Sequence, residues 1–133
     1  TTHCDAESLS MAKRQADGDA AAEKMLSLGP TGNDGQLGVT RGVTRPVWEP
    51  DERGMALYGI ARRVAQTIGF DINPQSAGGG SDGNFTGALG VPTLDGLGAV
   101  GAGAHAAHEQ VVVDELPRRA ALVAGIIRAL GFR

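Results

Sequence analysis

The most informative stretch of this chain runs from Gly78 to Glu109 and reads GGGSDGNFTGALGVPTLDGLGAVGAGAHAAHE. It opens on three consecutive glycines and ends on two histidines and a glutamate. Glycine allows backbone angles and close approaches that other residues resist. Within the stretch, Gly83–Leu89 has the composition of a short helix, and the apolar run Val91–Leu94 is typical of a strand buried on both faces. We therefore expect a folded protein with one long region whose conformation is defined by its backbone.

Outward from this stretch, four segments have the apolar spacing of helices. We expect them after Asp5 or Ser8 and up to Gly29-Pro30, from near Asp51 to Gly69, from Gly83 (capped by Asp82) to Gly90, and from the N-cap Asp114 to Gly131. The last is the clearest, because Pro117 falls in its first turn and a glycine follows its end.

Strand candidates lie between these helices. They are Leu37–Val43, which alternates, then Phe70–Ile72, Val91–Leu94 and the β-branched run Gln110–Val113. From Asp51 onward the order is helix, strand, helix, strand, strand, helix, which is typical of the α/β class. The first 45 or so residues give only one helix and one strand, which cannot bury an apolar face alone. The following segment, Arg45–Pro50, predicts a crossing between two structural units, although a single irregular domain with a surface excursion is the alternative.

Composition excludes several classes of function. The chain has 133 residues, with 12 Lys and Arg against 15 Asp and Glu and a net charge of -3. This balance argues against a nucleic-acid footprint and against a basic membrane surface. The single cysteine, Cys4, excludes an intrachain disulfide and a multi-cysteine zinc cluster. No apolar run approaches the ~20 residues that span a bilayer, and no signal pattern is visible, so we expect a cytoplasmic protein.

The glycine loop, Gly78–Gly83, has more than one interpretation. It formally fits G-x-G-x-x-G, but the strand before it is weak and the helix after it is short, so its context argues against a dinucleotide site. Consecutive N–H groups could instead face an anion, with Ser81 and Asn84 adding hydrogen bonds to a carboxylate. The alternative is a tight turn that needs glycine only for its backbone angles.

Three other groups of residues could carry chemistry. His105, with His108 and Glu109 close behind it, could ligate a metal, although a lone histidine is often structural. Arg45 and Arg41, near Trp48, could clamp a carboxylate bidentately, although exposed arginines are usually solvated charges. The pair His3-Cys4 is rejected as a nucleophile and base, since the side chains of adjacent residues rarely reach one point.

The segments Gly78–Thr86, Gly90–Gly98 and His105–Glu109 resemble the C-terminal signature of a family of co-catalytic zinc peptidases. The family contains glutamate carboxypeptidase, acetylornithine deacetylase and succinyl-diaminopimelate desuccinylase. Arg45–Pro50 is similar to the family's return from an inserted lid domain to its catalytic domain. The resemblance implies that residues 1–45 end a ferredoxin-like lid or dimerisation domain, as a helix plus a strand. It implies that residues 46–133 form the C-terminal part of a catalytic α/β domain.

The resemblance also implies roles for single residues. His105 matches the family's last zinc ligand, and Gly79, Gly80 and Ser81 match the loop that lines the substrate carboxylate pocket; with Asn84 and Arg45 they are the predicted substrate-binding residues. A complete enzyme would hold two zinc ions, which polarise the scissile amide and activate water. The other ligands and the general base belong to an N-terminal catalytic segment, so no catalytic residue is predicted here and at most one zinc ion would bind weakly.

The implied function is part of a zinc-dependent amidohydrolase or carboxypeptidase that acts on a small peptide or N-acyl amino acid. We expect the chain alone to be inactive, and we expect it to self-associate as a homo-oligomer, for example a dimer. Two alternatives remain: an anion-binding module built on the Gly78–Gly83 loop, and a non-catalytic partner of a separate N-terminal half.

Overall fold

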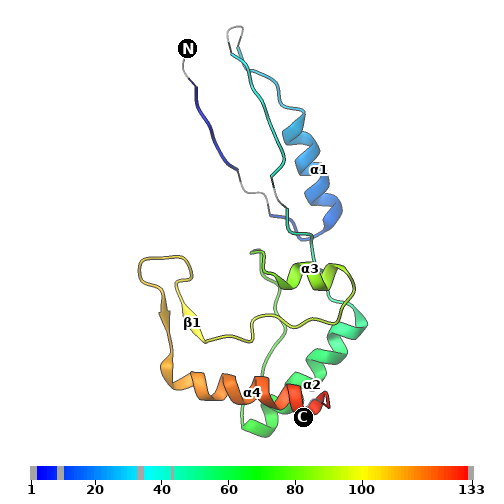
Figure 1. Ribbon diagram of the computed structural model, residues 1–133, viewed down its shortest axis with the longest axis vertical. Helices are drawn as coiled ribbons and strands as arrows, with labels where there is room; N and C mark the ends of the chain where they lie inside the picture. Colours follow the sequence, from blue (N-terminus) through cyan, green and yellow to red (C-terminus); the bar gives the residue numbers. More distant parts are fainter. Residues whose placement is uncertain (1–2, 9–10, 33–34, 43, 132–133) are drawn as a thin grey trace. The chain divides into compact units, whose positions relative to one another are not determined.

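The computed structural model describes residues 3–8, 11–32, 35–42 and 44–131. They divide into two compact units. The first comprises Thr1–Glu49 and Ala77–Leu89, and the second comprises Pro50–Ser76 and Gly90–Arg133. The described residues form a mixed helical structure with few strands, and each unit is considered by itself (Figure 1).

The first unit contains helices α1, Gln15–Leu26, and α3, Gly83–Ala88. Helix α1 begins later than the sequence predicted, because Arg14 is extended, with φ -125° and ψ 143°. The guanidinium of Arg14 donates to both carboxylate oxygens of Asp17, at 2.9 Å each, across this first turn. The predicted end near Gly29 is confirmed to within three residues. The predicted helical residues Leu9 and Ser10 lie outside the described part of the chain.

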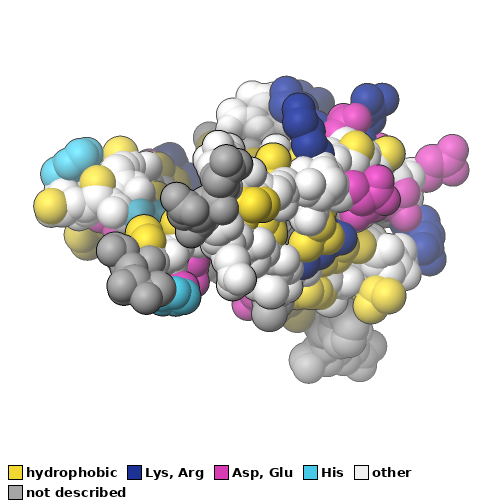
Figure 2. Space-filling model, turned by 90° about the horizontal axis from the view of Figure 1, so that it is seen from above, with side chains coloured by type: hydrophobic (Ala, Val, Ile, Leu, Met, Phe, Trp, Pro, Cys, Tyr) yellow, Lys and Arg dark blue, Asp and Glu magenta, His cyan; other side chains and the backbone are white. Residues whose placement is uncertain are grey.

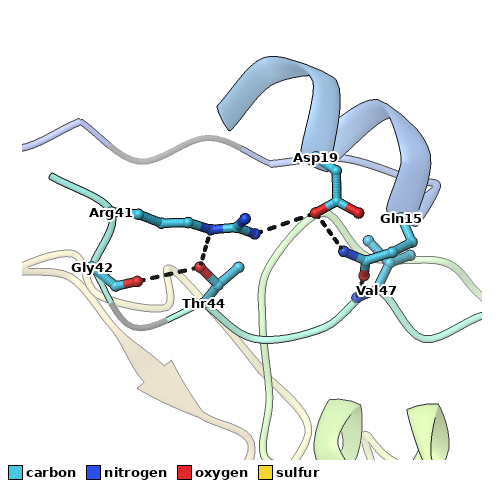
Figure 3. Close-up of polar contacts among 6 residues, drawn as sticks. All are labelled: Gln15, Asp19, Arg41, Gly42, Thr44 and Val47. Atoms are coloured by element: carbon cyan, nitrogen blue, oxygen red, sulfur yellow. Dashed lines mark hydrogen bonds and ion pairs between the residues drawn. The ribbon is translucent and has the colours of Figure 1, made fainter. Parts of the chain in front are cut away.

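Side chains of α1 hold the segment that follows it (Figure 3). Asp19 accepts a hydrogen bond from Arg41 at 3.3 Å, and the amide of Gln15 accepts one from the backbone N–H of Val47 at 3.0 Å. The predicted strand Leu37–Val43 is wrong over its described residues 37–42, since no described segment pairs with their backbone; Val43 lies outside the described residues. The hydrogen bonds from Arg41 and Val47 to α1 connect this part of the chain to the helix, and strand pairing does not.

The second unit is built on α2, Glu52–Ile68, and α4, Leu116–Ala129 (Figure 1). Both predicted ends of α2 are confirmed: Asp51 accepts a hydrogen bond from the Gly54 N–H at 2.7 Å, and Gly69 closes the helix with φ 96°. The buried core contains small and branched residues from both helices, namely Ala61, Ala65, Leu122 and Ile126. A Cβ on Gly125 would lie 2.5 Å from Val64, so glycine permits the close approach of the two helices.

The start of α4 differs from the prediction. A short 3-10 turn, Val113–Glu115, precedes the helix, and Glu115 rather than Asp114 is its N-cap residue. Pro117 does lie in the first turn, as predicted. Gly131 follows the helix with φ 87°, a left-handed conformation that suits glycine.

The sheet is smaller than the sequence predicted. Strands β1, Gly101–Ala102, and β2, Gln110–Val111, pair antiparallel with Gly101 opposite Val111. Thus only the first half of the predicted strand Gln110–Val113 forms, and β1 was not predicted. The expected strands Phe70–Ile72 and Val91–Leu94 are wrong, because neither has a partner among the described residues.

Apolar side chains of these two segments instead cover the α2–α4 core. Phe70, Ile72 and Leu94 are partly buried against it. The hydroxyl of Tyr58, on α2, donates to the carbonyl of Ile72 at 2.8 Å and fixes the chain after the helix. None of the helices that the structure describes has the length and apolar character needed to cross a membrane.

Candidate functional site

The glycine loop in the first unit is closed by its own polar residues. The Ser81 N–H donates to the side-chain oxygen of Asn84 at 2.9 Å, and the Gly83 N–H donates to the Ser81 hydroxyl at 2.9 Å. The Asn84 amide donates in turn to the carbonyl of Pro46 at 2.9 Å. Asp82 was predicted to cap α3, but its side chain makes no capping hydrogen bond. Instead, the Ser81 hydroxyl accepts the hydrogen bond of the first N–H group of α3, that of Gly83.

These contacts decide which donors of the loop remain for a ligand. Ser81 and Asn84 are half-buried, and they use their side chains to hold the loop together. A bound carboxylate would have to compete with those internal bonds. Gly79 and Gly80 are exposed, and within the described residues their N–H groups donate no hydrogen bond. The backbone of the two glycines is therefore the accessible donor surface.

Arg45 lies against this same loop. A Cβ on Gly80 would come within 2.8 Å of Cδ of Arg45, so the absence of a side chain at Gly80 makes room for the arginine stem. The guanidinium is 3.7 Å from a carboxylate oxygen of Asp82, beyond hydrogen-bond distance. The side chains of Arg45 and Asp82 are 52% and 96% exposed. The structure thus brings together Arg45, Gly80, Ser81 and Asn84, with Gly79 adjacent in the chain.

The other arginines of the first unit are committed elsewhere. Arg41 donates to the Thr44 hydroxyl at 3.2 Å and pairs with Asp19 (Figure 3), and Arg14 is paired with Asp17. The hydrogen bond that Asp17 accepts raises the pKa of Arg14 above its ordinary value. Arg45 is the one arginine described in this unit that makes no hydrogen bond.

Two features of the loop were missed by sequence reasoning. The first is Asp82 as the partner of Arg45: the two residues are far apart in the sequence, and no local pattern indicates that they approach each other. The second is the contact of Trp48 with α3: a Cβ on Gly87 would lie 2.3 Å from the indole nitrogen. The indole therefore lies directly on the glycine, which anchors α3 to the Arg45–Pro50 segment.

His105 lies in the second unit, in the connection between β1 and β2 (Figure 1). Its backbone is left-handed, with φ 65°, which is uncommon for a residue with a side chain. The N–H of His105 donates to the Glu109 carboxylate at 3.3 Å, and the Ala106 N–H donates to the Gly103 carbonyl at 2.9 Å. The ring of His108 lies against Gly103. His105 is exposed, so its imidazole is accessible to a ligand.

The described residues do not assemble a metal centre by themselves. No group of three or more histidine, cysteine, aspartate or glutamate side chains among them is arranged to hold a metal ion. A protein metal site of the zinc type takes three or four protein ligands. His105 can supply one ligand, and the remainder would have to come from outside these residues.

The family model for peptidase family M20/M25/M40 matches residues 9–129. That match includes the glycine loop, Arg45 and His105. No solved structure matches the chain.

Proposed function

Because this chain belongs to peptidase family M20/M25/M40, we propose that it is part of a zinc-dependent amidohydrolase acting beside a C-terminal amino acid. The family indicates a metallopeptidase or amidohydrolase that is typically metal-dependent. The observation that carries the proposal is the span of the match, residues 9–129. Glutamate carboxypeptidase is the proposed type, with a small peptide or an N-acyl amino acid as substrate.

The first unit is proposed to bind the substrate carboxylate. Arg45 contributes an accessible guanidinium, and Gly79 and Gly80 contribute exposed N–H groups. Ser81 and Asn84 hold the loop in place through the hydrogen bonds described above. A guanidinium and adjacent backbone N–H groups together match the geometry of a carboxylate.

The second unit is proposed to contribute His105 as one metal ligand. His105 is exposed, and its backbone N–H donates to the Glu109 carboxylate, so the imidazole itself remains accessible to a metal ion. The general base and the other ligands are proposed to lie in a separate N-terminal catalytic segment, so the chain alone would be inactive. Residues 1–45 are proposed to end a lid domain, and residues 46–133 to belong to the catalytic domain.

The test combines this chain with an N-terminal segment of the same family. The chain alone, with added zinc, is expected to hydrolyse none of a panel of N-acyl amino acids. Co-expression with the N-terminal segment is expected to give activity that His105→Ala removes and His108→Ala retains. Turnover by the isolated chain that His105→Ala abolishes would overturn the proposed inactivity, and restored activity insensitive to His105→Ala would overturn the ligand role.

An anion-binding module is the second candidate. The observation that favours it is that Arg45, Gly79 and Gly80 lie together within this one unit. Calorimetry with zinc, glutamate and phosphate distinguishes the anion-binding module from the peptidase proposal. The peptidase proposal predicts at most weak zinc binding and recognition of a carboxylate, whereas the module predicts anion binding that is equally strong for phosphate and unaffected by zinc.

A further inference from the structure

The pairing of Arg45 with Asp82 has a consequence for ligand binding. Asp82 is almost fully exposed, and it approaches the guanidinium only to 3.7 Å. An exposed pair at this distance is weak, because water solvates both charges. By contrast, Asp17 meets both donors of Arg14 at 2.9 Å. The contact between Arg45 and Asp82 is thus the looser of these two pairs.

The stem of Arg45 lies directly against the glycine loop. Gly80 leaves space for the stem, and a Cβ there would crowd Cδ at 2.8 Å. Gly80 has no left-handed φ, so the close approach of Arg45 is what glycine permits at this position. The guanidinium thus lies beside the loop, and the distant, exposed Asp82 compensates its charge only partly.

We infer that Asp82 is an internal competitor for Arg45, which an incoming substrate carboxylate displaces. The inference rests on the proposed function, since it assigns Asp82 a specificity role at the same carboxylate site. With Arg45 positive and Asp82 negative, the site carries no net charge. Asp82 therefore lowers the affinity for every carboxylate ligand, and it discriminates most strongly against ligands with a second negative charge close to the first.

The test is a titration of the chain with N-acetylalanine, followed through the backbone amide signals of Gly79 and Gly80. Asp82→Asn keeps the shape of the side chain and removes its charge. We expect it to tighten binding about fivefold at low ionic strength and less at high salt, as for one charge about 4 Å away in water. The gain should be larger for N-acetylglutamate than for N-acetylalanine.

Two variants complete the design. Arg45→Gln is expected to weaken binding, and Asp82→Asn is expected to give no gain in the Arg45→Gln background, as a double-mutant cycle requires for a coupled pair. Asp17→Asn changes the net charge equally within the same unit, but Asp17 pairs with Arg14, so it is expected to leave binding unchanged. N-acetylalaninamide, which lacks the carboxylate, should not bind.

The outcomes separate the inference from the function on which it rests. If Arg45→Gln weakens binding but Asp82→Asn does not tighten it, Asp82 is no competitor and the carboxylate site stands. A gain that persists without Arg45, or that Asp17→Asn reproduces, also overturns the inference, since it would reflect the general field of the protein. If neither wild type nor Asp82→Asn binds the acid more tightly than the neutral amide, the carboxylate site itself is wrong.

Discussion

Gly87 shows how one missing side chain organises the first unit. The indole of Trp48 occupies the space that a Cβ on Gly87 would need, at 2.3 Å from its nitrogen. Gly87→Ala is expected to lower the free energy of unfolding of the unit by about 1–3 kcal/mol, because overpacking forces one side chain away. Trp48 is the only tryptophan, so its fluorescence during urea unfolding reports the change.

A matched control for that substitution lies in the same unit. Gly38 has no atom within 4 Å of an added Cβ, so Gly38→Ala is expected to leave the midpoint unchanged. Equal midpoints for the two variants would contradict the proposed packing of Trp48 on α3.

Asp71 illustrates a pH-dependent contact. Arg62 donates to both of its carboxylate oxygens, at 2.9 and 3.0 Å, and this lowers the pKa of Asp71 below its ordinary value. The contact therefore stabilises the fold above the unfolded-state pKa of about 3.9, and its contribution is lost as the pH falls through the folded-state pKa.

Asp71→Asn is accordingly expected to destabilise the second unit at about pH 7, and the difference from wild type is expected to shrink as the pH falls below the unfolded-state pKa of about 3.9. Urea unfolding followed by circular dichroism at each pH measures this difference in the free energy of unfolding. The effect should be small, because both side chains are about half exposed. Asp114→Asn is the control, since the Asp114 carboxylate has no partner in the described region. A difference that persists undiminished in acid would argue against the ion pair.

At the scale of elements, α2 and α4 pack through a glycine. Gly125→Ala places a methyl group 2.5 Å from Val64 and is expected to cost about 1–3 kcal/mol of unfolding free energy. Val64→Ala in the same chain removes the obstructing methyl groups and should recover part of the loss, since the two sites are coupled. Denaturation followed by helical circular dichroism measures both variants.

Gly59→Ala serves as the control on α2. The nearest atom to its added Cβ is the guanidinium of Arg63 at 3.7 Å, an ordinary contact. Because alanine is the better helix former, this variant is expected to be neutral or slightly more stable, by up to about 1 kcal/mol. If Gly125→Ala behaves in the same way, the helices do not approach as closely as described.

The elements also show what a sequence predicts well. The bounds of α2 follow from Asp51 and Gly69, because a cap and a left-handed glycine are local devices. Most of the predicted strands did not form, for the opposite reason: Val91–Leu94 has the composition of a buried strand, but pairing depends on a distant partner that a local pattern does not contain. At the candidate site, the loop was predicted from its glycines, whereas the approach of Asp82 to Arg45 depended on their tertiary positions.

At the scale of the whole chain, the buried apolar core that the structure describes lies in the second unit alone, and much apolar surface stays exposed. Within the described residues, only Ala61, Ala65, Leu122 and Ile126 are buried hydrophobics, whereas Leu89 is 82% and Val113 is 69% exposed. Hydrophobic side chains are also visible between the charged ones on the face shown in Figure 2. Apolar surface of this kind favours association.

We therefore predict concentration-dependent self-association, measured by light scattering across a dilution series. Val113→Lys should shift the distribution toward the monomer, whereas Gln66→Lys, which adds the same charge at an exposed polar position of α2, should shift it less. A monomer at every concentration would contradict the prediction.

The chain has a single tyrosine besides its single tryptophan, and the two fall in different units. Tyr58 is tied through its hydroxyl to Ile72 beside the α2–α4 core. Each unit thus carries its own intrinsic chromophore. Ultraviolet spectroscopy on the unlabelled protein can therefore determine whether the two units unfold together or one after the other.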